Sequence, residues 1–521
     1  MTNDSMFWAD QVARKIIKEK GNKKRYVCAA GITPSGVIHI GNCREIMTVD
    51  LVSRALRDLG KNVRFIYSWD DFDRLRKIPK NVPNPKEMEK YLMKAIVDVP
   101  DPWKCHKSYA EHFEKAVEDA LPNVGIKPEF IYQNKMFRKC AYAKEIKQVL
   151  ENKDKICNIL NKFRKEPLGE DWNPVRVYCS KCDKEETKIT NWDKEYSLSY
   201  ECKCGYKEMF DFRKKGIAKL QWRVDWPMRW NYEKVDFEPA GKDHSTVGGS
   251  RDTGVIIQKT VWKEDAPVYL MYDFVTVKGA GGKMSSSLGN VVTLDDVLAI
   301  YTPEVVRFFF AGTKPLKEFD FSFDEDVFKF YEDFYKAERI YYDKENVPER
   351  DKKHWSRVYE MSMIDKPTKT MPIQPGFRHC VNLITKHNDV NNALNEVSEL
   401  NKTDKDRYKS ILERAKFWLE NYAPSHHKAV LQESASKDVL NKLTVNQKKA
   451  LKEFANKLEN TKTEEDIKNL CFGVAKSNNI KPMEFFKSCY LVLLGNERGP
   501  RLTQLIMSIG KKKVAELLKN V

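Results

Sequence analysis

The sequence predicts an α/β protein with a cysteine-rich insertion and an all-α C-terminal region. Two strand-like segments, residues 25–30 and 61–67, flank a segment of helical character that ends near Gly60. Four cysteines in two close pairs follow between residues 179 and 204, and beyond residue 314 the pattern is mainly helical. A strand–helix–strand order is typical of an open parallel sheet. Ligands bind such sheets at the carboxyl ends of the strands, where we therefore expect the site.

Composition narrows the class of protein. The chain has 521 residues, with 92 lysines and arginines against 75 acids and a net charge of +17. This surplus attracts polyanions, with nucleic acid the first candidate, although a generally lysine-rich proteome is the alternative. No apolar run approaches the roughly 20 residues that span a bilayer, and the N-terminus lacks the apolar core of a signal peptide. Scattered cysteines fit a reducing cytoplasm, so we expect a cytoplasmic protein without membrane contact.

A glycine-containing turn joins the first strand to the helix and ends in His39-Ile40-Gly41-Asn42. Such a turn lets backbone N–H groups and a helix N-terminus approach a phosphate chain. His39 and Asn42 lie one helical turn apart, so both can direct donors at phosphates, and Gly41 leaves bare backbone for a flat ring. The alternative is that His39 is a capping or core histidine.

A second glycine-rich stretch lies far downstream, where Gly279 to Gly282 precede Lys283-Met284-Ser285-Ser286-Ser287. Attack on the α-phosphate of ATP expels diphosphate, so its catalyst mainly positions and neutralises a growing negative charge. A lysine on a mobile loop brings positive charge to the leaving group and then withdraws. For Lys283 alone, a solvated loop lysine is the alternative.

Acidic residues follow the second strand at Asp70, Asp71 and Asp73. At the carboxyl end of a parallel strand they can bind an ammonium group or a ribose. The alternative for each is that it caps the following turn.

The four paired cysteines indicate zinc. Cys179-x2-Cys182 and Cys202-x-Cys204 supply four thiolates on two knuckles, which is typical of a closed structural site in a zinc ribbon. The second pair is C-x-C where C-x2-C is commoner, which leaves open whether Cys202 or Cys204 is the fourth ligand.

A second group with metal-ligand chemistry is Asp101, Cys105, His106 and His112. On a helix Asp101 and Cys105 share a face, and a carboxylate, a thiolate and two imidazoles suit Zn²⁺. By spacing alone, unrelated surface residues are the alternative.

An aromatic segment and a second glycine turn complete the candidates. Trp222, Trp226 and Trp230 are four residues apart, which predicts a packed helix face or, with Asp225 nearby, a face for a cationic substrate. Gly241-Lys242-Asp243-His244 and Gly248-Gly249-Ser250 form a polar glycine-rich turn, and residues 267–275 predict a strand.

Together these motifs resemble one family. GITPSGVIHIGN, WDDFDR, the two metal-ligand groups, LQWRVDWP, GKDH with GGS, and KMSSS occur in the order found in class I lysyl-tRNA synthetases, whose "HIGH" and "KMSKS" motifs the first and last resemble. The resemblance implies a Rossmann-type catalytic domain that joins L-lysine to tRNA(Lys) through a lysyl-adenylate. It implies ATP with Mg²⁺, two structural zinc ions, and a C-terminal domain that binds the anticodon.

The motifs and the resemblance together give the expected site residues. The expected catalytic residues are His39, Asn42 and Lys283. The expected ATP-binding residues are Pro34, His39, Gly41, Asn42, Gly248, Lys283 and Ser286. The expected lysine-binding residues are Gly31, Thr33, Asp70, Trp222, His244 and Tyr272, and the expected metal ligands are Asp101, Cys105, His106, His112, Cys179, Cys182, Cys202 and Cys204. Asn42 ends the first motif and keeps a donor amide, whereas Ser286 replaces a lysine of many relatives, so Lys283 carries more of the charge.

These expectations divide the chain into four parts. Residues 1–100 and 216–313 form the two halves of the catalytic domain, 101–215 the zinc-binding insertion, and 314–521 the helical stem-contact and anticodon-binding region. In the last part, residues 344–353 are a charged connection, Thr444 and Gln447 predict a capping box, and Pro482 and Gly495 bound a helix.

Two rival functions stay open. A glutamyl-type class I synthetase shares the catalytic core but needs basic residues for its substrate side chain, whereas the pocket candidates here are aromatic and acidic. A zinc-bearing protein that binds tRNA without consuming ATP is the other, and the intact His39, Gly41 and Lys283 argue against it.

Overall fold

The computed structural model describes residues 6–79, 82–278, 291–397, 400–424, 427, 431–499 and 501–521. The chain forms two compact units. The first comprises the described parts of Met1–Val297, Val306–Phe321 and Val347–Pro367, and the second those of Leu298–Val305, Ser322–Asn346 and Thr368–Val521. The predicted phosphate loop, from Gly279 to Ser287, lies outside the described residues.

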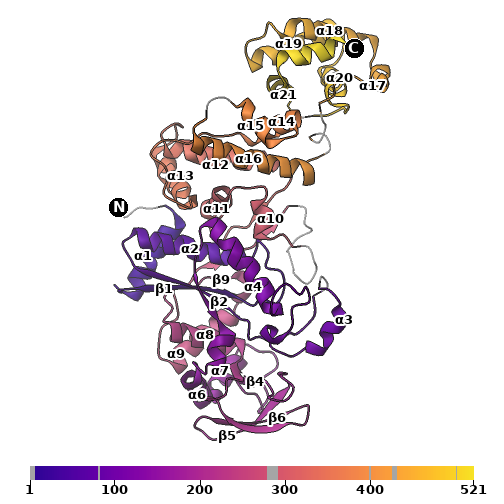
Figure 1. Cartoon of the computed structure of the whole chain (residues 1–521). Coiled ribbons are helices and arrows are strands. Elements are labelled where there is room, and N and C mark those ends of the chain that lie inside the picture. Colours follow the sequence, from indigo (N-terminus) through magenta and orange to yellow (C-terminus); the bar gives the residue numbers. More distant parts are fainter. Residues whose placement is uncertain are drawn as a thin grey trace. The chain divides into compact units, whose positions relative to one another are not determined.

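A parallel sheet forms the centre of the first unit (Figure 1). Strands β1 (Tyr26–Ile32), β2 (Val63–Trp69) and β3 (Glu129–Tyr132) pair in the order β1-β2-β3. On the other side of β1, Phe237 bridges in parallel to both Cys28 and Val268. Beyond it β9 (Ala240–Gly241) pairs in parallel with β10 (Met271–Tyr272). The sheet therefore continues on both sides of β1, as the strand–helix–strand pattern predicts.

Helix α2 (Cys43–Asp58) connects β1 to β2 and confirms the helix predicted after the glycine turn. Most of its residues are buried, including Arg44 and Asp50. Gly60 follows its end with φ +74° and donates its N–H to Arg57 at 2.9 Å. Glycine reaches this left-handed conformation at no steric cost, so Gly60 stops the helix as predicted.

The cysteine-rich insertion is a small antiparallel layer with its own core. Strands β5 (Thr187–Trp192), β6 (Ser197–Cys202) and β7 (Lys207–Asp211) form an antiparallel sheet, and β4 (Val175–Val177) pairs with β8 (Ala218–Leu220). Buried side chains of this layer pack with those of helices α6 and α7.

The remaining elements of the first unit and of the segments that join it to the second have these bounds: α1 Trp8–Lys20, α3 Pro85–Met88, α4 Tyr109–Ala120, α5 Gln133–Arg138, α6 Ala143–Glu151, α7 Lys153–Asn161, α8 Trp222–Glu233, α9 Ser250–Val261, β11 Val275–Val277, α10 Leu294–Leu298, α11 Pro303–Gly312, β12 Phe319–Phe321 and α13 Glu349–Ser362.

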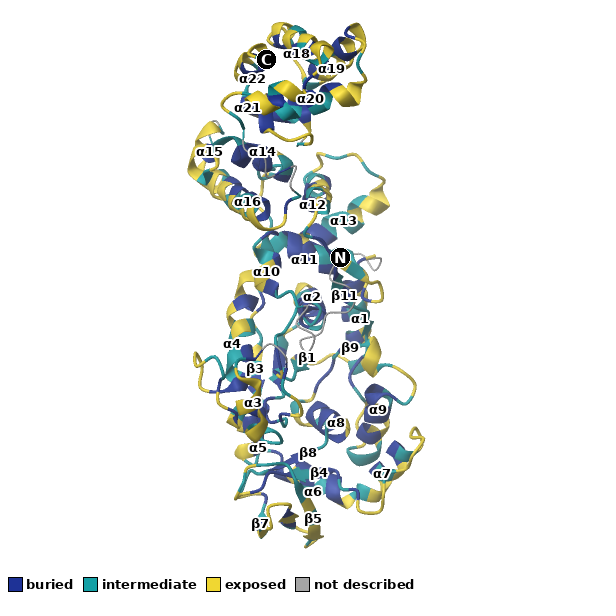
Figure 2. Ribbon diagram, turned by 90° about the vertical axis from the view of Figure 1, so that its right-hand side faces the viewer, coloured by how far each residue is buried: buried dark blue, intermediate teal, exposed yellow. Residues whose placement is uncertain are grey.

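The second unit is helical where it is described. Its helices are α12 Asp326–Tyr341, α14 Phe377–His387, α15 Val390–Glu396, α16 Lys402–Asn421, α17 Lys437–Lys442, α18 Val445–Leu458, α19 Glu464–Ser477, α20 Pro482–Leu494, α21 Leu502–Ile509 and α22 Lys511–Lys519. They bury one face and expose the other (Figure 2). The predicted capping box between Thr444 and Gln447 is present at the start of α18.

Three local predictions differ from the structure. The strand expected at 267–275 is broken into β10 and β11. Asp101 and Cys105 lie in turns before α4 rather than on a helix, because α4 begins only at Tyr109, where Ser108 caps it. Half of the charged connection at 344–353 is helical, since α13 starts at Glu349. No helix of the described residues is long and apolar enough to cross a membrane.

Candidate active site and metal centres

A cavity of about 500 Å³ opens where the parallel strands end, and we call it the catalytic cavity. Its wall includes Gly31 and Thr33 at the end of β1, Asp70 after β2, Gly241 in β9 and Tyr272 in β10. The chain leaves β1 toward β2 on one side, and Phe237 and β10 lie on the other. Ligands bind open α/β sheets at such a change of direction, so the cavity lies where the fold predicts.

The turn from His39 to Asn42 leads into α2 and lines this cavity. Asn42 Oδ1 accepts a hydrogen bond from the His39 backbone N–H at 3.1 Å, which directs the donor half of the amide elsewhere. A Cβ at Gly41 would lie 2.8 Å from His39 Nδ1 and 2.9 Å from the carbonyl oxygen of Val275. Glycine is therefore required for the close approach of the His39 ring and β11.

Glu45 is a cavity residue that the sequence analysis missed. It lies one helical turn after Gly41 on α2, and that spacing was the available signal. Its Oε1 accepts from the Gly31 N–H at 3.0 Å and its Oε2 from the Tyr272 hydroxyl at 2.6 Å. Both donors are neutral, and burial raises the pKa of Glu45 to about 7. A carboxylate in this setting is suited to form an ion pair with a cationic group of a ligand.

Two other carboxylates of the cavity, those of Asp70 and Asp73, are already paired with protein cations. Asp70 bonds the buried Arg229 of α8 at 2.6 Å, and Arg229 also pairs with Asp225 at 3.2 Å. Asp73 pairs with the buried Lys219 of β8. Within the described residues no Lys or Arg forms such a pair with Glu45, so the negative charge available to a ligand is placed there rather than at Asp70.

Aromatic rings close one side of the catalytic cavity. Trp222, at the start of α8, stacks on Trp226 with ring centroids 5.2 Å apart, and His244 lies 6.2 Å from the Trp222 ring. Trp222, His244 and Tyr272 all line the cavity, whereas Trp226 and Trp230 are buried beneath it. The predicted packing is therefore present at Trp226 and Trp230, and Trp222 forms part of the cavity wall; the binding of a cationic substrate there stays a prediction.

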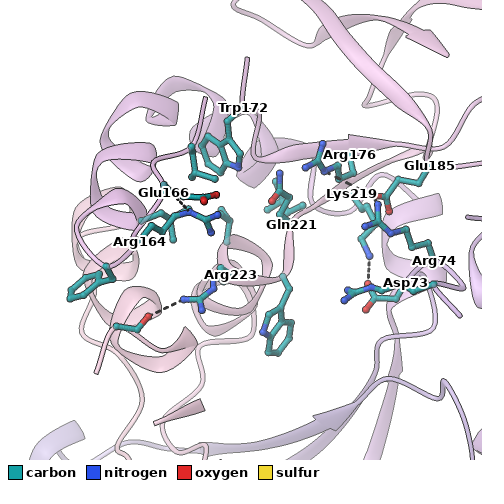
Figure 3. A pocket seen from close by; sticks show the side chains of 18 of the residues that line it. Asp73, Arg74, Arg164, Glu166, Trp172, Arg176, Glu185, Lys219, Gln221 and Arg223 are labelled. Atoms are coloured by element: carbon teal, nitrogen blue, oxygen red, sulfur yellow. Dashed lines mark hydrogen bonds and ion pairs between the residues drawn. The ribbon is translucent and has the colours of Figure 1, made fainter. Parts of the chain in front are cut away.

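The other predicted ATP-binding residues do not line the catalytic cavity or lie outside the described residues. Pro34 is buried outside the lining of the catalytic cavity, and Gly248 lines a second, neighbouring cavity (Figure 3). Lys283 and Ser286 lie outside the described residues.

Arg76 is a second cavity residue that the sequence analysis missed. It is the one lysine or arginine among the described residues that line the catalytic cavity.

Comparison with known proteins decides the family. A model described as tRNA synthetases class I (K) matches residues 6–365, and one described as an anticodon binding domain matches residues 375–521. The chain belongs to the class I lysyl-tRNA synthetase family. The predicted α/β catalytic fold and helical C-terminal domain are confirmed.

Similar proteins cover nearly the whole synthetase. The lysine–tRNA ligase of Borreliella burgdorferi is 47% identical over 96% of this chain and 97% of its own. The lysine–tRNA ligase of Pyrococcus horikoshii is 41% identical over 98% of this chain and 99% of its own. A solved glutamate tRNA ligase from Elizabethkingia meningosepticum aligns with 95% of this chain and 98% of its own at 13% identity and a TM-score of 0.41. An alignment at that level has no bearing on the substrate.

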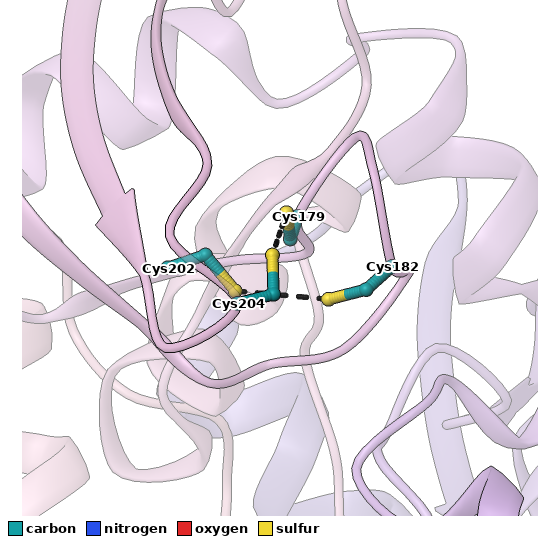
Figure 4. Close-up of side chains that lie close together, drawn as sticks. All are labelled: Cys179, Cys182, Cys202 and Cys204. Atoms are coloured by element: carbon teal, nitrogen blue, oxygen red, sulfur yellow. Dashed lines mark hydrogen bonds between the residues drawn. The ribbon is translucent and has the colours of Figure 1, made fainter.

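The four cysteines of the synthetase's insertion converge on one point (Figure 4). The Sγ atoms of Cys179 and Cys204 are 3.8 Å apart, and those of Cys182 and Cys202 are 3.7 Å apart. Four sulfurs in a tetrahedron about 2.3 Å from zinc are about 3.8 Å from one another. All four side chains therefore fit a zinc ion, including both members of the C-x-C pair.

The second predicted group also converges. Cys105 Sγ lies 3.1 Å from His106 Nδ1, 3.2 Å from His112 Nδ1 and 3.2 Å from Asp101 Oδ2. Asp101 Oδ1 is 3.6 Å from His112 Nδ1. These separations suit one small ion with mixed ligands, although a turn rather than a helix brings Asp101 and Cys105 together. Trp103 stacks on the His112 ring at 4.2 Å and so fixes its orientation.

Proposed function

We propose that this chain ligates L-lysine to tRNA(Lys), with ATP as the energy source. A lysine carboxylate oxygen attacks the α-phosphate of ATP, the bond to diphosphate breaks, and lysyl-adenylate forms. A ribose hydroxyl at the 3′ end of tRNA then attacks the lysyl carbonyl carbon and AMP leaves. The observation that carries this proposal is the pairing of an uncompensated carboxylate, Glu45, with the signature turn His39–Asn42 in one cavity.

Lysine binding is assigned to Glu45 and the aromatic wall. The lysine side chain carries an ammonium group on a long apolar stem, so its site needs a carboxylate and apolar walls. Glu45 and the Tyr272 hydroxyl supply the polar end, and the rings of Trp222 and His244 supply the wall. Gly31 contributes through the N–H that holds Glu45. Asp70 then acts through Arg229, holding the floor of the cavity rather than the substrate.

ATP binding is assigned to the turn before α2. His39 and the amide nitrogen of Asn42 would donate to the phosphates, and Gly41 would leave room for the nucleotide. The loop with Lys283 and Ser286 would supply the charge that meets the leaving diphosphate. Mg²⁺ would enter bound to the ATP phosphates and neutralise part of their charge.

Two zinc ions are proposed as structural cofactors. Cys179, Cys182, Cys202 and Cys204 would hold one, and Asp101, Cys105, His106 and His112 the other. A closed set of four protein ligands leaves no position for substrate, so each ion would stabilise its loops without taking part in the reaction.

We assign a role to each part of the chain by analogy with the family. Residues 1–100 and 216–313 would carry catalysis, 101–215 the zinc-binding insertion, and 314–521 the contacts to the stem and anticodon of tRNA. A cytoplasmic location is proposed with this function, since tRNA charging takes place there.

Amino-acid-dependent exchange between ATP and labelled diphosphate tests the proposal. The full-length chain is assayed with each of the twenty amino acids, with and without tRNA. Exchange with lysine alone, or with lysine only when tRNA is added, supports the function. Exchange with another amino acid overturns the substrate, and tRNA binding without any exchange would leave a binding protein.

A further inference from the structure

The loop between β1 and the His39–Asn42 turn contacts helix α4. Residues 33–38 of this loop belong to no helix or strand, and most of them line the catalytic cavity. The Tyr109 hydroxyl of α4 donates to the Ser35 backbone oxygen at 2.9 Å. The Val37 side chain packs against a buried apolar cluster that includes Tyr109. Because a loop has no ladder of backbone hydrogen bonds, contacts of this kind determine its position.

Tyr109 is fully buried at the first position of α4. Ser108 caps this helix, and its hydroxyl accepts the Glu111 N–H at 3.1 Å. The Tyr109 backbone N–H donates to the Val99 oxygen at 2.8 Å. The residue is therefore held at its backbone, its ring and its hydroxyl, and a shift of the first turn of α4 would displace the hydroxyl from Ser35.

The same turn of α4 carries one ligand of the second zinc centre, which comprises Asp101, Cys105, His106 and His112. His112 follows Tyr109 by three residues, so the two side chains are neighbours on the helix surface. The Trp103 ring stacks on His112 at 4.2 Å, and its centroid lies 6.4 Å from that of Tyr109. The Phe113 ring lies 4.9 Å from His112 and 5.1 Å from Tyr109. Packed rings therefore connect the zinc centre to Tyr109.

The loop that precedes α4 is closed on the Asp101 carboxylate. This group accepts the backbone N–H groups of Trp103, Cys105 and His106 at 3.0, 2.9 and 2.8 Å. An ion held by this loop and by His112 would cross-link the loop to α4. The cross-link would reach α4 in its first turn, where helices fray.

We propose that Tyr109 is a positioning residue for ATP, through which the second zinc centre fixes the loop that precedes His39. This rests on the proposed function, which assigns His39 and Gly41 to ATP. With the ion bound, the first turn of α4 is fixed and Tyr109 holds the Ser35 carbonyl. Without the ion, this turn loosens and the contact to Ser35 weakens, so the cavity loses affinity for ATP.

The proposal distinguishes the two small substrates. On the proposed function, lysine binds at Glu45, which is held by Tyr272 and by the Gly31 N–H without any bond to α4. Loss of the Tyr109 contact should therefore weaken the binding of ATP and leave that of lysine nearly unchanged. A general loss of folded structure would weaken both.

The test measures binding of α,β-methylene-ATP, which cannot release diphosphate, beside binding of lysine, both by calorimetry. Tyr109→Phe keeps the ring and removes the hydroxyl. It is expected to weaken the ATP analogue about 5-fold, the effect of one neutral hydrogen bond, and to change lysine affinity by less than about 2-fold. Tyr335→Phe is the matched control and keeps both affinities, because the buried Tyr335 hydroxyl also donates to a backbone oxygen at 2.9 Å, that of Pro375, but lies in the second unit.

Zinc content supplies the second part of the test. Cys105→Ser is expected to lower the content from about two ions to about one per chain and to weaken the ATP analogue by a factor similar to that of Tyr109→Phe. The double variant shows little further loss, because both changes act through the same contact. Cys140→Ser, outside both zinc centres, keeps the zinc content and the affinity for the analogue.

Equal losses for lysine and the ATP analogue in Tyr109→Phe, or no loss for the analogue, would overturn the proposal. A Cys105→Ser variant that loses an ion and keeps wild-type affinity for the analogue would also overturn it, as would additive losses in the double variant. Binding of the analogue requires no turnover, so it tests the positioning role even in a chain that does not activate lysine. Lysine-dependent exchange on the same samples shows a failure of the proposed function separately.

Discussion

The Tyr272 hydroxyl donates to Glu45 Oε2 at 2.6 Å and joins the end of β10 to the first turns of α2. The pair puts a carboxylate in the catalytic cavity with neutral partners only. On the proposed function, this carboxylate is the group that would bind the ammonium of the lysine substrate.

Glu45→Gln is expected to raise the KM for lysine about 100-fold, because a buried charged contact costs about 2 to 5 kcal/mol when one partner is truncated. The KM for ATP should change little, since the proposed function assigns Glu45 to lysine and not to ATP. Both are measured by lysine-dependent exchange. Tyr272→Phe, which keeps the carboxylate, should lose much less. An equal loss for ATP and lysine would contradict the assignment.

Lysine binding should depend on pH through Glu45. The pKa of this carboxyl is raised to about 7 by burial, so below pH 7 it is mostly neutral and pairs poorly with an ammonium. Apparent affinity for lysine should therefore increase as pH rises through about 7 and then level off, while the lysine ammonium stays charged. The profile of kcat/KM measures this. Glu45→Gln should flatten it, and a persistent inflection in that variant would assign the titration to another group.

Removal of one cysteine ligand should lower both the zinc content and the thermal stability of the protein. Cys182→Ser is expected to lower the zinc content from about two ions to about one per chain, because a structural site needs its full ligand set. Metal analysis and thermal unfolding measure the two effects. Cys140→Ser changes a half-buried cysteine outside both clusters and should leave both unchanged. An unaltered zinc content in Cys182→Ser would refute the assignment.

A buried ion pair stabilises the helical side of the first unit. Arg307 of α11 donates to Asp50 of α2 at 2.8 Å and to the backbone oxygens of Val124 and Met361 at 3.0 and 3.1 Å. Arg307→Met should lower the free energy of unfolding by about 3 kcal/mol, because it leaves two buried carbonyls without this partner and the buried Asp50 with Arg54 as its one remaining cation among the described residues. Urea denaturation followed by tryptophan fluorescence measures it. Lys329→Met breaks an exposed pair with Asp333 and should have no measurable effect; equal losses would contradict the role of burial.

The sequence determined the elements whose signals are local. Gly60 ends α2 because its backbone conformation is left-handed, and Thr444 with Gln447 starts α18 because both partners lie within one helical turn. The spacing of the paired cysteines predicted that their four thiolates come together, because close pairs of this kind are typical of a single zinc site. The order of the motifs was sufficient to indicate the family.

Only the tertiary structure decided which charged groups face a ligand. Asp70 and Glu45 are both acids near a strand end or a helix start, and spacing does not distinguish them. Arg229, at 159 positions from Asp70 in the chain, neutralises one of them, whereas the other has the neutral Tyr272 hydroxyl and Gly31 N–H as its hydrogen-bond partners. The neighbouring cavity that Gly248 lines likewise joins Arg76, Arg164 and Arg223 from distant segments. Charge compensation depends on distance in space, which the sequence does not contain.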